Sequence, residues 1–264
     1  MAKTIIVTGA SSGIGNVLLK TLLKMGYNVL GISRTAAKDL DYRHYACDLS
    51  EQASIEKMTQ IIIKDVTKID AIIHVAGMGI ADALEYTRYQ DAEYIHKVNV
   101  LGPFYLNQKL IPLLRKSDSP KIIHVGSIAG TITIPFQAFY SMSKASLFSY
   151  SEALRMELKP FKIAVSIILP GDIKTPFTEN RVKTYTSNDP LYNQRIERAI
   201  EKMAYDEQHG MPPETVVKMI VKFLKKKRLP IYKTVGLQYK VIMGLVKFLP
   251  HRLRLAIIYK LYGK

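Results

Sequence analysis

The chain has 264 residues, 48% of them hydrophobic, which suits one α/β domain with a sizeable core and an extension. Its single cysteine, Cys47, excludes an internal disulfide framework and a cysteine-based zinc site, and we expect it to be buried. The formal net charge of +16 is concentrated in residues 211–264, which hold thirteen Lys or Arg and one acid, and this indicates an anionic surface rather than nucleic acid as the partner.

Apolar, β-rich runs alternate with helical patterns along the chain, and their near-continuous apolar character predicts strands covered on both faces. We expect strands at 4–8, 28–32, 44–46, 71–75, 121–125, 164–169 and 229–235. We expect helices at 14–25, 52–66, 91–114, 138–158, 194–205 and 215–226. This order predicts right-handed βαβ units and a Rossmann-type, doubly wound parallel sheet. The catalytic domain is expected at 1–235, followed by a helical extension at 236–264.

The first apolar run flows directly into a glycine motif, which favours a first strand over a signal peptide. The motif is Thr8-Gly9-Ala10-Ser11-Ser12-Gly13-Ile14-Gly15. Gly9 permits a sharp turn, Gly13 allows close approach of a pyrophosphate, and Gly15 allows the helix to pack on the strand. The N–H groups at the helix N-terminus would hold the phosphates. The loop therefore predicts dinucleotide binding, with Ser11, Ser12 and Ile14 also in contact with the cofactor.

The end of the second predicted strand bears on the choice of cofactor. It has Ser33 and Arg34 where an acid would accept the ribose hydroxyls of NAD. Arg34 can bind a 2′-phosphate through charge-assisted hydrogen bonds, although it can also simply face solvent. We therefore expect NADP(H) to be preferred over NAD(H).

Tyr140 and Lys144 are four residues apart, so they share one face of a helix, and Ser127 lies thirteen residues upstream. A neighbouring ammonium lowers the pKa of a phenol, which would let Tyr140 exchange a proton with a substrate oxygen near neutral pH. The pair alone occurs often by chance on solvated helix faces. No cluster of His, Cys, Asp or Glu has the spacing of metal ligands, and no metal is expected.

These motifs, in this order, resemble those of the short-chain dehydrogenase/reductase family, and the resemblance covers residues 3–235. Ser127, Tyr140 and Lys144 resemble its active-site triad, and Asn99 resembles its catalytic asparagine. Further resemblances to the family's cofactor site lie at Asp48, Leu49, Ala76, Gly77, Pro170, Gly171, Ile173 and Thr175. One residue departs from the pattern: His74 stands where the family has an asparagine that ties down neighbouring backbone. Imidazole can supply a similar hydrogen bond, and we expect His74 to be structural.

The resemblance implies hydride transfer between nicotinamide C4 and a carbonyl carbon. Tyr140 would then donate a proton to the carbonyl oxygen and Ser127 a hydrogen bond. Lys144 would lower the pKa of Tyr140 and hold the nicotinamide ribose, and Asn99 would position a water that links Lys144 to solvent. It also implies a homodimer or homotetramer, because the helices at 91–114 and 138–158 resemble the family's dimer faces.

Two segments outside the motifs bear on the substrate. Residues 172–213, which include a polar cluster at 184–189, are expected to form a substrate lid, with a plain surface loop as the alternative. The extension is basic and amphipathic over 237–249 and 252–262 and too short to span a bilayer. It would either lie on an anionic membrane surface or pack on its own domain or on a partner copy.

The apolar residues Phe136, Phe139, Ile173 and Phe177, together with that extension, favour a hydrophobic carbonyl or alcohol resembling a lipid, steroid or retinoid. We expect a cytoplasmic oxidoreductase, peripheral on the inner membrane surface if the extension binds lipid. The alternatives are a non-catalytic NADP-binding regulator and a membrane-surface adaptor.

Overall fold

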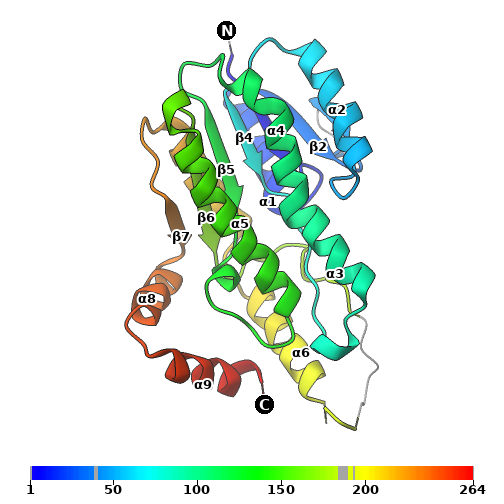
Figure 1. Ribbon diagram of the computed structural model, residues 1–264, viewed down its shortest axis with the longest axis vertical. Helices are drawn as coiled ribbons and strands as arrows, with labels where there is room; N and C mark the ends of the chain where they lie inside the picture. Colours follow the sequence, from blue (N-terminus) through cyan, green and yellow to red (C-terminus); the bar gives the residue numbers. More distant parts are fainter. Residues whose placement is uncertain (1, 39–40, 184–189, 193, 264) are drawn as a thin grey trace.

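The computed structural model describes residues 2–38, 41–183, 190–192 and 194–263, and its centre is one seven-stranded sheet (Figure 1). All neighbouring strands run parallel, in the order β3-β2-β1-β4-β5-β6-β7. The strands are β1 (Thr4–Thr8), β2 (Asn28–Ser33), β3 (Arg43–Ala46), β4 (Ala71–His74), β5 (Lys121–Val125), β6 (Ala164–Pro170) and β7 (Tyr232–Val235). The expected doubly wound Rossmann-type sheet is confirmed.

Helices cover both faces of the sheet, which explains why its strands are apolar throughout. Successive residues of β1 show the two sides: Ile5 and Val7 belong to one core cluster and Ile6 to the other. The first cluster is completed by α1 (Gly13–Lys24) and α7 (Pro213–Lys225). The second is completed by α2 (Gln52–Asp65), α4 (Gly102–Leu114) and α5 (Ala138–Glu157). Short 3₁₀ turns lie at η1 (Leu84–Tyr86), η3 (Ile128–Gly130) and η4 (Lys159–Phe161).

Two elements differ from the sequence prediction. The single helix expected at 91–114 is α3 (Tyr89–His96), the π-helical turn η2 (Lys97–Leu101) and α4 in succession. The last strand starts at Tyr232 rather than at residue 229. Pro230 has no N–H for a ladder, and the carbonyls of Leu229 and Pro230 instead accept hydrogen bonds from the guanidinium of Arg155 at 2.9 and 3.3 Å.

The segment between β6 and α7 carries α6 (Arg195–Gln208), close to the helix that the sequence predicts there. Ile173 and Met211 form an isolated parallel bridge that closes the base of this segment. The polar cluster at 184–189 lies outside the described residues.

The extension forms two helices, α8 (Leu237–Val246) and α9 (His251–Tyr262), which follow the carboxyl end of β7 (Figure 1). Pro250 separates them. They pack on their own chain: Arg195 Nε of α6 donates to the Gly263 carbonyl at 2.8 Å, and Tyr262 donates to Asp206 at 3.1 Å. Within the described residues, every helix is too short or too polar to cross a bilayer.

Candidate active site

The loop between β1 and α1 forms one wall of a large cavity at the carboxyl edge of the sheet. Gly9 (φ +69°) and Gly13 (φ +51°) take left-handed conformations that glycine adopts without steric cost. A Cβ on Gly15 would overlap the carbonyl oxygen of Gly9, so helix and loop are in close contact. The described side chains leave the first N–H groups of α1 uncapped. The loop therefore fits a pyrophosphate at a helix N-terminus.

Ser33, Arg34 and Asp48 line the same cavity from the ends of β2 and β3. Arg34 is exposed. Ser33 is buried, and its hydroxyl donates to the Thr35 carbonyl at 2.7 Å. The Asp48 carboxylate accepts hydrogen bonds from the N–H and hydroxyl of Ser50 at 2.9 and 2.7 Å. These residues place a hydrogen-bonded carboxylate and an exposed guanidinium in the cavity wall at the ends of β2 and β3.

His74 does not tie down the loop after β4, although an imidazole could supply such a hydrogen bond. Its Nε2 lies 2.8 Å from Oδ1 of the buried Asn107, while the loop is held by Thr8, whose hydroxyl accepts the N–H groups of Val75 and Ala76 at 3.1 Å each. The His74 ring stacks on His124, with centroids 4.8 Å apart. Burial lowers the pKa of His74 to about 4, so the imidazole is neutral. The residue is part of the core.

Asn99 lies in the π-helical turn and holds the backbone next to the cavity. Its Oδ1 accepts the Met78 N–H at 2.9 Å, and its Nδ2 donates to the Met78 carbonyl and to the Ser143 hydroxyl, each at 3.0 Å. A Cβ on Gly77 would lie 3.3 Å from both Asn99 Oδ1 and Lys144 Nζ. The turn therefore places Asn99 and Lys144 side by side behind Gly77.

Ser127, Tyr140 and Lys144 meet in the cavity from two elements. Ser127 follows β5, and its hydroxyl accepts the N–H of Ala129 at 3.1 Å. Tyr140 and Lys144 come from one face of α5, with Nζ 5.8 Å from the centre of the Tyr140 ring. Nζ donates to the Val125 carbonyl at 3.2 Å. The phenol, the hydroxyl and the ammonium are thus gathered in the wall of one cavity.

Burial is the main influence on the pKa values of Tyr140 and Lys144. It raises the pKa of Tyr140 to about 12 and lowers the pKa of Lys144 to about 8. The sequence predicts the opposite direction for Tyr140, because it makes Lys144 the main influence. A hydrogen bond from Ser127 does act to lower the pKa of Tyr140, but desolvation of the buried phenol outweighs it. Tyr140 therefore carries its proton at neutral pH.

The cavity measures about 920 Å³ and brings the predicted residues together. Ser127 and all the predicted cofactor-binding residues line it: Gly9, Ser11, Ser12, Gly13, Ile14, Gly15, Ser33, Arg34, Asp48, Leu49, Ala76, Gly77, Tyr140, Lys144, Pro170, Gly171, Ile173 and Thr175. Asn99 does not line the cavity, but its side chain is hydrogen-bonded to the backbone of Met78, which does. Of the four predicted apolar residues, Ile173 and Phe177 line the cavity. Phe136 and Phe139 do not, because Phe136 packs against Ala81 and Ile196, and Phe139 packs against His96.

Sequence reasoning missed a second group of lining residues. Met203 and Glu207 come from α6, Glu207 pairing with the buried Arg181, and Asp172 follows Gly171. A further set comes from α8, α9 and the turn between them: Tyr239, Ile242, Leu245, Val246, Leu249, Arg254, Ile257, Ile258, Leu261 and Tyr262. The helical spacing of these apolar residues was a signal for an amphipathic face, but it did not show that the face closes this cavity.

A glycine loop that opens the first helix of a doubly wound parallel sheet, with serine, tyrosine and lysine in the same cavity, is typical of nucleotide-binding oxidoreductases. The chain belongs to the short chain dehydrogenase family, whose sequence profile matches residues 3–186. It is 33% identical over 242 residues to the 3-ketodihydrosphingosine reductase of Bacteroides thetaiotaomicron, covering 91% of this chain and 90% of that protein.

Solved structures share the fold at lower identity. A short-chain dehydrogenase from Streptomyces avermitilis has a TM-score of 0.83 at 23% identity and covers 98% of this chain and 96% of its own. A Brucella melitensis reductase complexed with NADH and a Shigella flexneri dehydrogenase complexed with NADP each have a TM-score of 0.71, at 22% and 21% identity, covering 88% of this chain and 95% of theirs. The protein is therefore an oxidoreductase of this family, with a fold that binds nicotinamide dinucleotides.

Proposed function

We propose that the protein is an NADP(H)-dependent oxidoreductase that interconverts a carbonyl and an alcohol on a hydrophobic, lipid-like substrate. One observation carries the proposal: a cavity with the glycine loop and Arg34 in its wall also contains Ser127, Tyr140 and Lys144 and an apolar wall from α8 and α9. The cofactor would supply the hydride. The chain would supply binding, orientation and the proton.

Each polar residue then has a distinct role. Tyr140 donates its proton to the carbonyl oxygen, and the pKa of about 12 keeps the phenol protonated until charge develops on that oxygen. Ser127 donates a hydrogen bond to the same atom, which stabilises charge where it forms. Lys144 holds the nicotinamide ribose. Asn99 keeps Met78 and Gly77 in place, and because its side chain is engaged there, a water linking Lys144 to solvent would bind its main-chain carbonyl.

The preference for NADP(H) rests on the end of β2. Arg34 is exposed beside the cavity, and the sequence has no acid at this strand end to accept ribose hydroxyls. Arg34→Asp should lower the affinity for NADPH about 10- to 100-fold relative to NADH, because a charge-assisted contact is replaced by repulsion. Titration of both cofactors by fluorescence measures the ratio. An unchanged ratio would contradict the assignment of Arg34.

The lipid-like substrate is supported by the apolar residues of α8 and α9 around the cavity and by the activity named for the Bacteroides relative. The test is NADPH oxidation with a panel of long-chain ketones and aldehydes.

Tyr140→Phe should lower turnover about 10²- to 10⁴-fold while NADPH binding is retained. Tyr89→Phe, an exposed tyrosine on α3, is the matched control. Near-normal turnover in Tyr140→Phe would refute the role of the phenol, and NADPH binding without turnover of any carbonyl would favour a regulator.

We also propose that the protein is a homodimer or homotetramer that associates through α4 and α5. Four large apolar side chains are exposed along this part of the fold, namely Leu101 of η2, Phe104 of α4, and Met142 and Met156 of α5, with exposed fractions of 53%, 42%, 50% and 70%. A second copy would cover them.

A further inference from the structure

The helices α8 and α9 expose an unusual number of large apolar side chains. On α8, Leu237, Val241 and Leu245 follow at four-residue spacing and are 78%, 56% and 59% exposed. Phe248, in the turn after α8, is 88% exposed, the highest value for a large apolar residue in the described chain. On α9 the corresponding residues are Leu253, Leu255, Ile257, Tyr259 and Leu261. Such a surface is larger than scattered exposed residues and indicates a partner.

The charge of this surface is of one sign. Residues 237–262 contain no Asp or Glu, and Lys240, Lys247, Arg252 and Lys260 are exposed among the apolar residues. A second copy of the chain would bring the same positive charge to a two-fold contact, which disfavours self-association there. An anionic bilayer offers both an apolar phase and negative charge. With ten and twelve residues, α8 and α9 are too short to span a bilayer but suited to lie in its interface.

The same helices form the mouth of the substrate cavity. Ile242, Leu245, Ile257 and Leu261 line the cavity and are also between 41% and 59% exposed, so they make an apolar rim that faces outward. Tyr239 and Ile258 are buried on the inner side. An alkyl chain that passes from a membrane interface into the cavity would therefore meet apolar side chains at this mouth.

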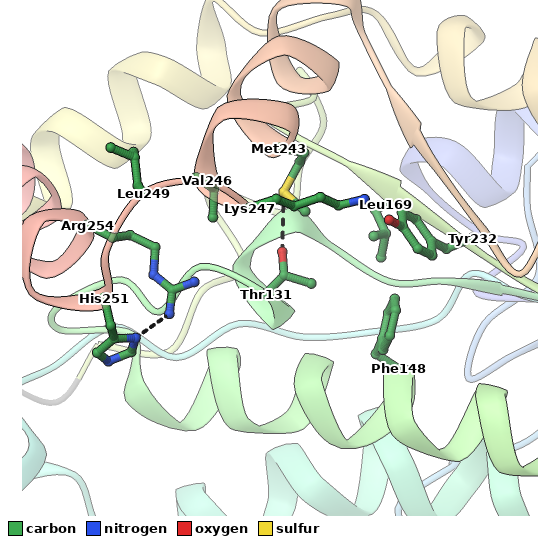
Figure 2. A pocket seen from close by; sticks show the side chains of 10 residues that line it. All are labelled: Thr131, Phe148, Leu169, Tyr232, Met243, Val246, Lys247, Leu249, His251 and Arg254. Atoms are coloured by element: carbon green, nitrogen blue, oxygen red, sulfur yellow. Dashed lines mark hydrogen bonds between the residues drawn. The ribbon is translucent and has the colours of Figure 1, made fainter.

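The contact between the α8–α9 turn and the body is loose. A second pocket of about 350 Å³ lies beneath the turn, between α8, β7 and α5 (Figure 2). Val246, Leu249 and Arg254 line both this pocket and the cavity. Two weak contacts join α8 and the turn to the body across this pocket. Thr131 donates to Met243 Sδ at 3.4 Å, and Lys247 Nζ lies 5.7 Å from the centre of the Tyr232 ring. The strong hydrogen bond of α8, from Tyr239 to Asp172 at 2.6 Å, lies away from the turn, so a shift of the turn that admits a chain need not break it.

We propose that α8 and α9 dock on an anionic lipid bilayer and hold the apolar mouth of the cavity against it, so that a lipid carbonyl substrate enters from the membrane. This entry route rests on the proposed function, whereas the docking can be tested without any turnover. The surface is defined by Leu237, Val241, Phe248 and Leu253 on the outside and by the apolar rim around the mouth.

The first experiment measures partition of the full-length protein by sedimentation with vesicles. We expect binding to phosphatidylcholine vesicles that contain phosphatidylglycerol, and much weaker binding to phosphatidylcholine alone. Phe248→Ser should weaken partition by about tenfold or more, because the variant lacks the exposed aromatic side chain that would enter the interface. Tyr89→Ser, which removes a comparably exposed aromatic residue from α3, should not change it. Equal recovery in the supernatant with and without anionic vesicles overturns the docking.

The charge contribution is tested separately. Lys240→Gln with Lys260→Gln should weaken binding to the anionic vesicles about tenfold, and added salt should remove much of the difference. Lys20→Gln with Lys57→Gln removes two exposed charges from α1 and α2 and should have little effect. Equal losses in both pairs would mean that net charge, and not this face, drives binding, and would overturn the proposal.

The entry route is tested by comparing two substrates. Anionic vesicles should raise kcat/KM for a long-chain ketone carried in the bilayer several-fold over the same ketone in neutral vesicles, and Phe248→Ser should abolish the gain. Turnover of a water-soluble short-chain ketone should be the same with both kinds of vesicle. Docking without a gain for the bilayer-borne ketone would overturn the entry route. Should Phe248→Ser lower the molecular mass in solution with no vesicle binding by the parent, the face joins copies of the chain instead.

Discussion

At the scale of single residues, protonation in the cavity is set by burial more than by neighbouring charges. Lys144 shows the consequence, since its pKa is lowered to about 8. It carries the ammonium below that pH and loses it above. If the ammonium orients the ribose, kcat/KM for reduction by NADPH should fall as pH rises through about 8, while Tyr140 stays protonated. A pH–rate profile measures this. A profile that stays flat well above that pH would contradict the role of Lys144.

His74 provides a second prediction at this scale, on stability. Its pKa falls from 6.5 to about 4 on folding, so between these values the unfolded chain binds a proton that the folded chain does not. Stability should therefore decrease as pH falls from about 6.5 towards 4, by roughly 3 kcal/mol for this residue. Urea unfolding across this range should show a smaller decrease in His74→Asn. An equal effect from His209→Asn, an exposed histidine on the same chain, would rule out burial as the cause.

At the scale of elements, the strands and most helices could be predicted because their signals are local. Apolar runs at β1, β4, β5 and β6 and the glycines of the first loop mark the sheet and the cofactor wall directly. The glycine loop, the end of β2 and the set Ser127, Tyr140 and Lys144 could be singled out for the same reason, since they lie directly after a strand or on one helical face. The family resemblance, rather than periodicity, supplied Asn99 and the remaining cofactor-binding residues: Asp48, Leu49, Ala76, Gly77, Pro170, Gly171, Ile173 and Thr175.

The features that could not be predicted depend on contacts between distant segments. The π-helical turn at Asn99 has no local sequence signal, and it fits the hydrogen bonds that Asn99 makes with Met78 and Ser143. His74 is structural, as expected, but its partner could not be predicted, because it bonds to Asn107, more than thirty residues away. The closure of the cavity by α8 and α9 likewise arises from packing against α6, which periodicity does not reveal.

At the scale of the whole molecule, we predict that α4 and α5 mediate self-association. Phe104→Glu places a charge on the exposed apolar part of α4 and should shift the protein to monomers, because a charge buried without a partner is costly. Ile61→Glu on α2 has a similar exposure, 46%, and should leave the mass unchanged. Light scattering coupled to size exclusion gives the mass. A monomeric parent protein would refute the prediction outright.

The position of the last helix affects how the protein can be handled. The Gly263 carbonyl is bonded to Arg195, and Leu261 and Tyr262 stand in the cavity wall. An affinity tag or surface anchor placed after α9 would be tethered at the proposed substrate entrance, and cutting the chain after β7 would remove a wall of the cavity. The amino end lies at the opposite end of the strands, where the inner strand β1 begins (Figure 1). Fusions and immobilisation should therefore use the amino end.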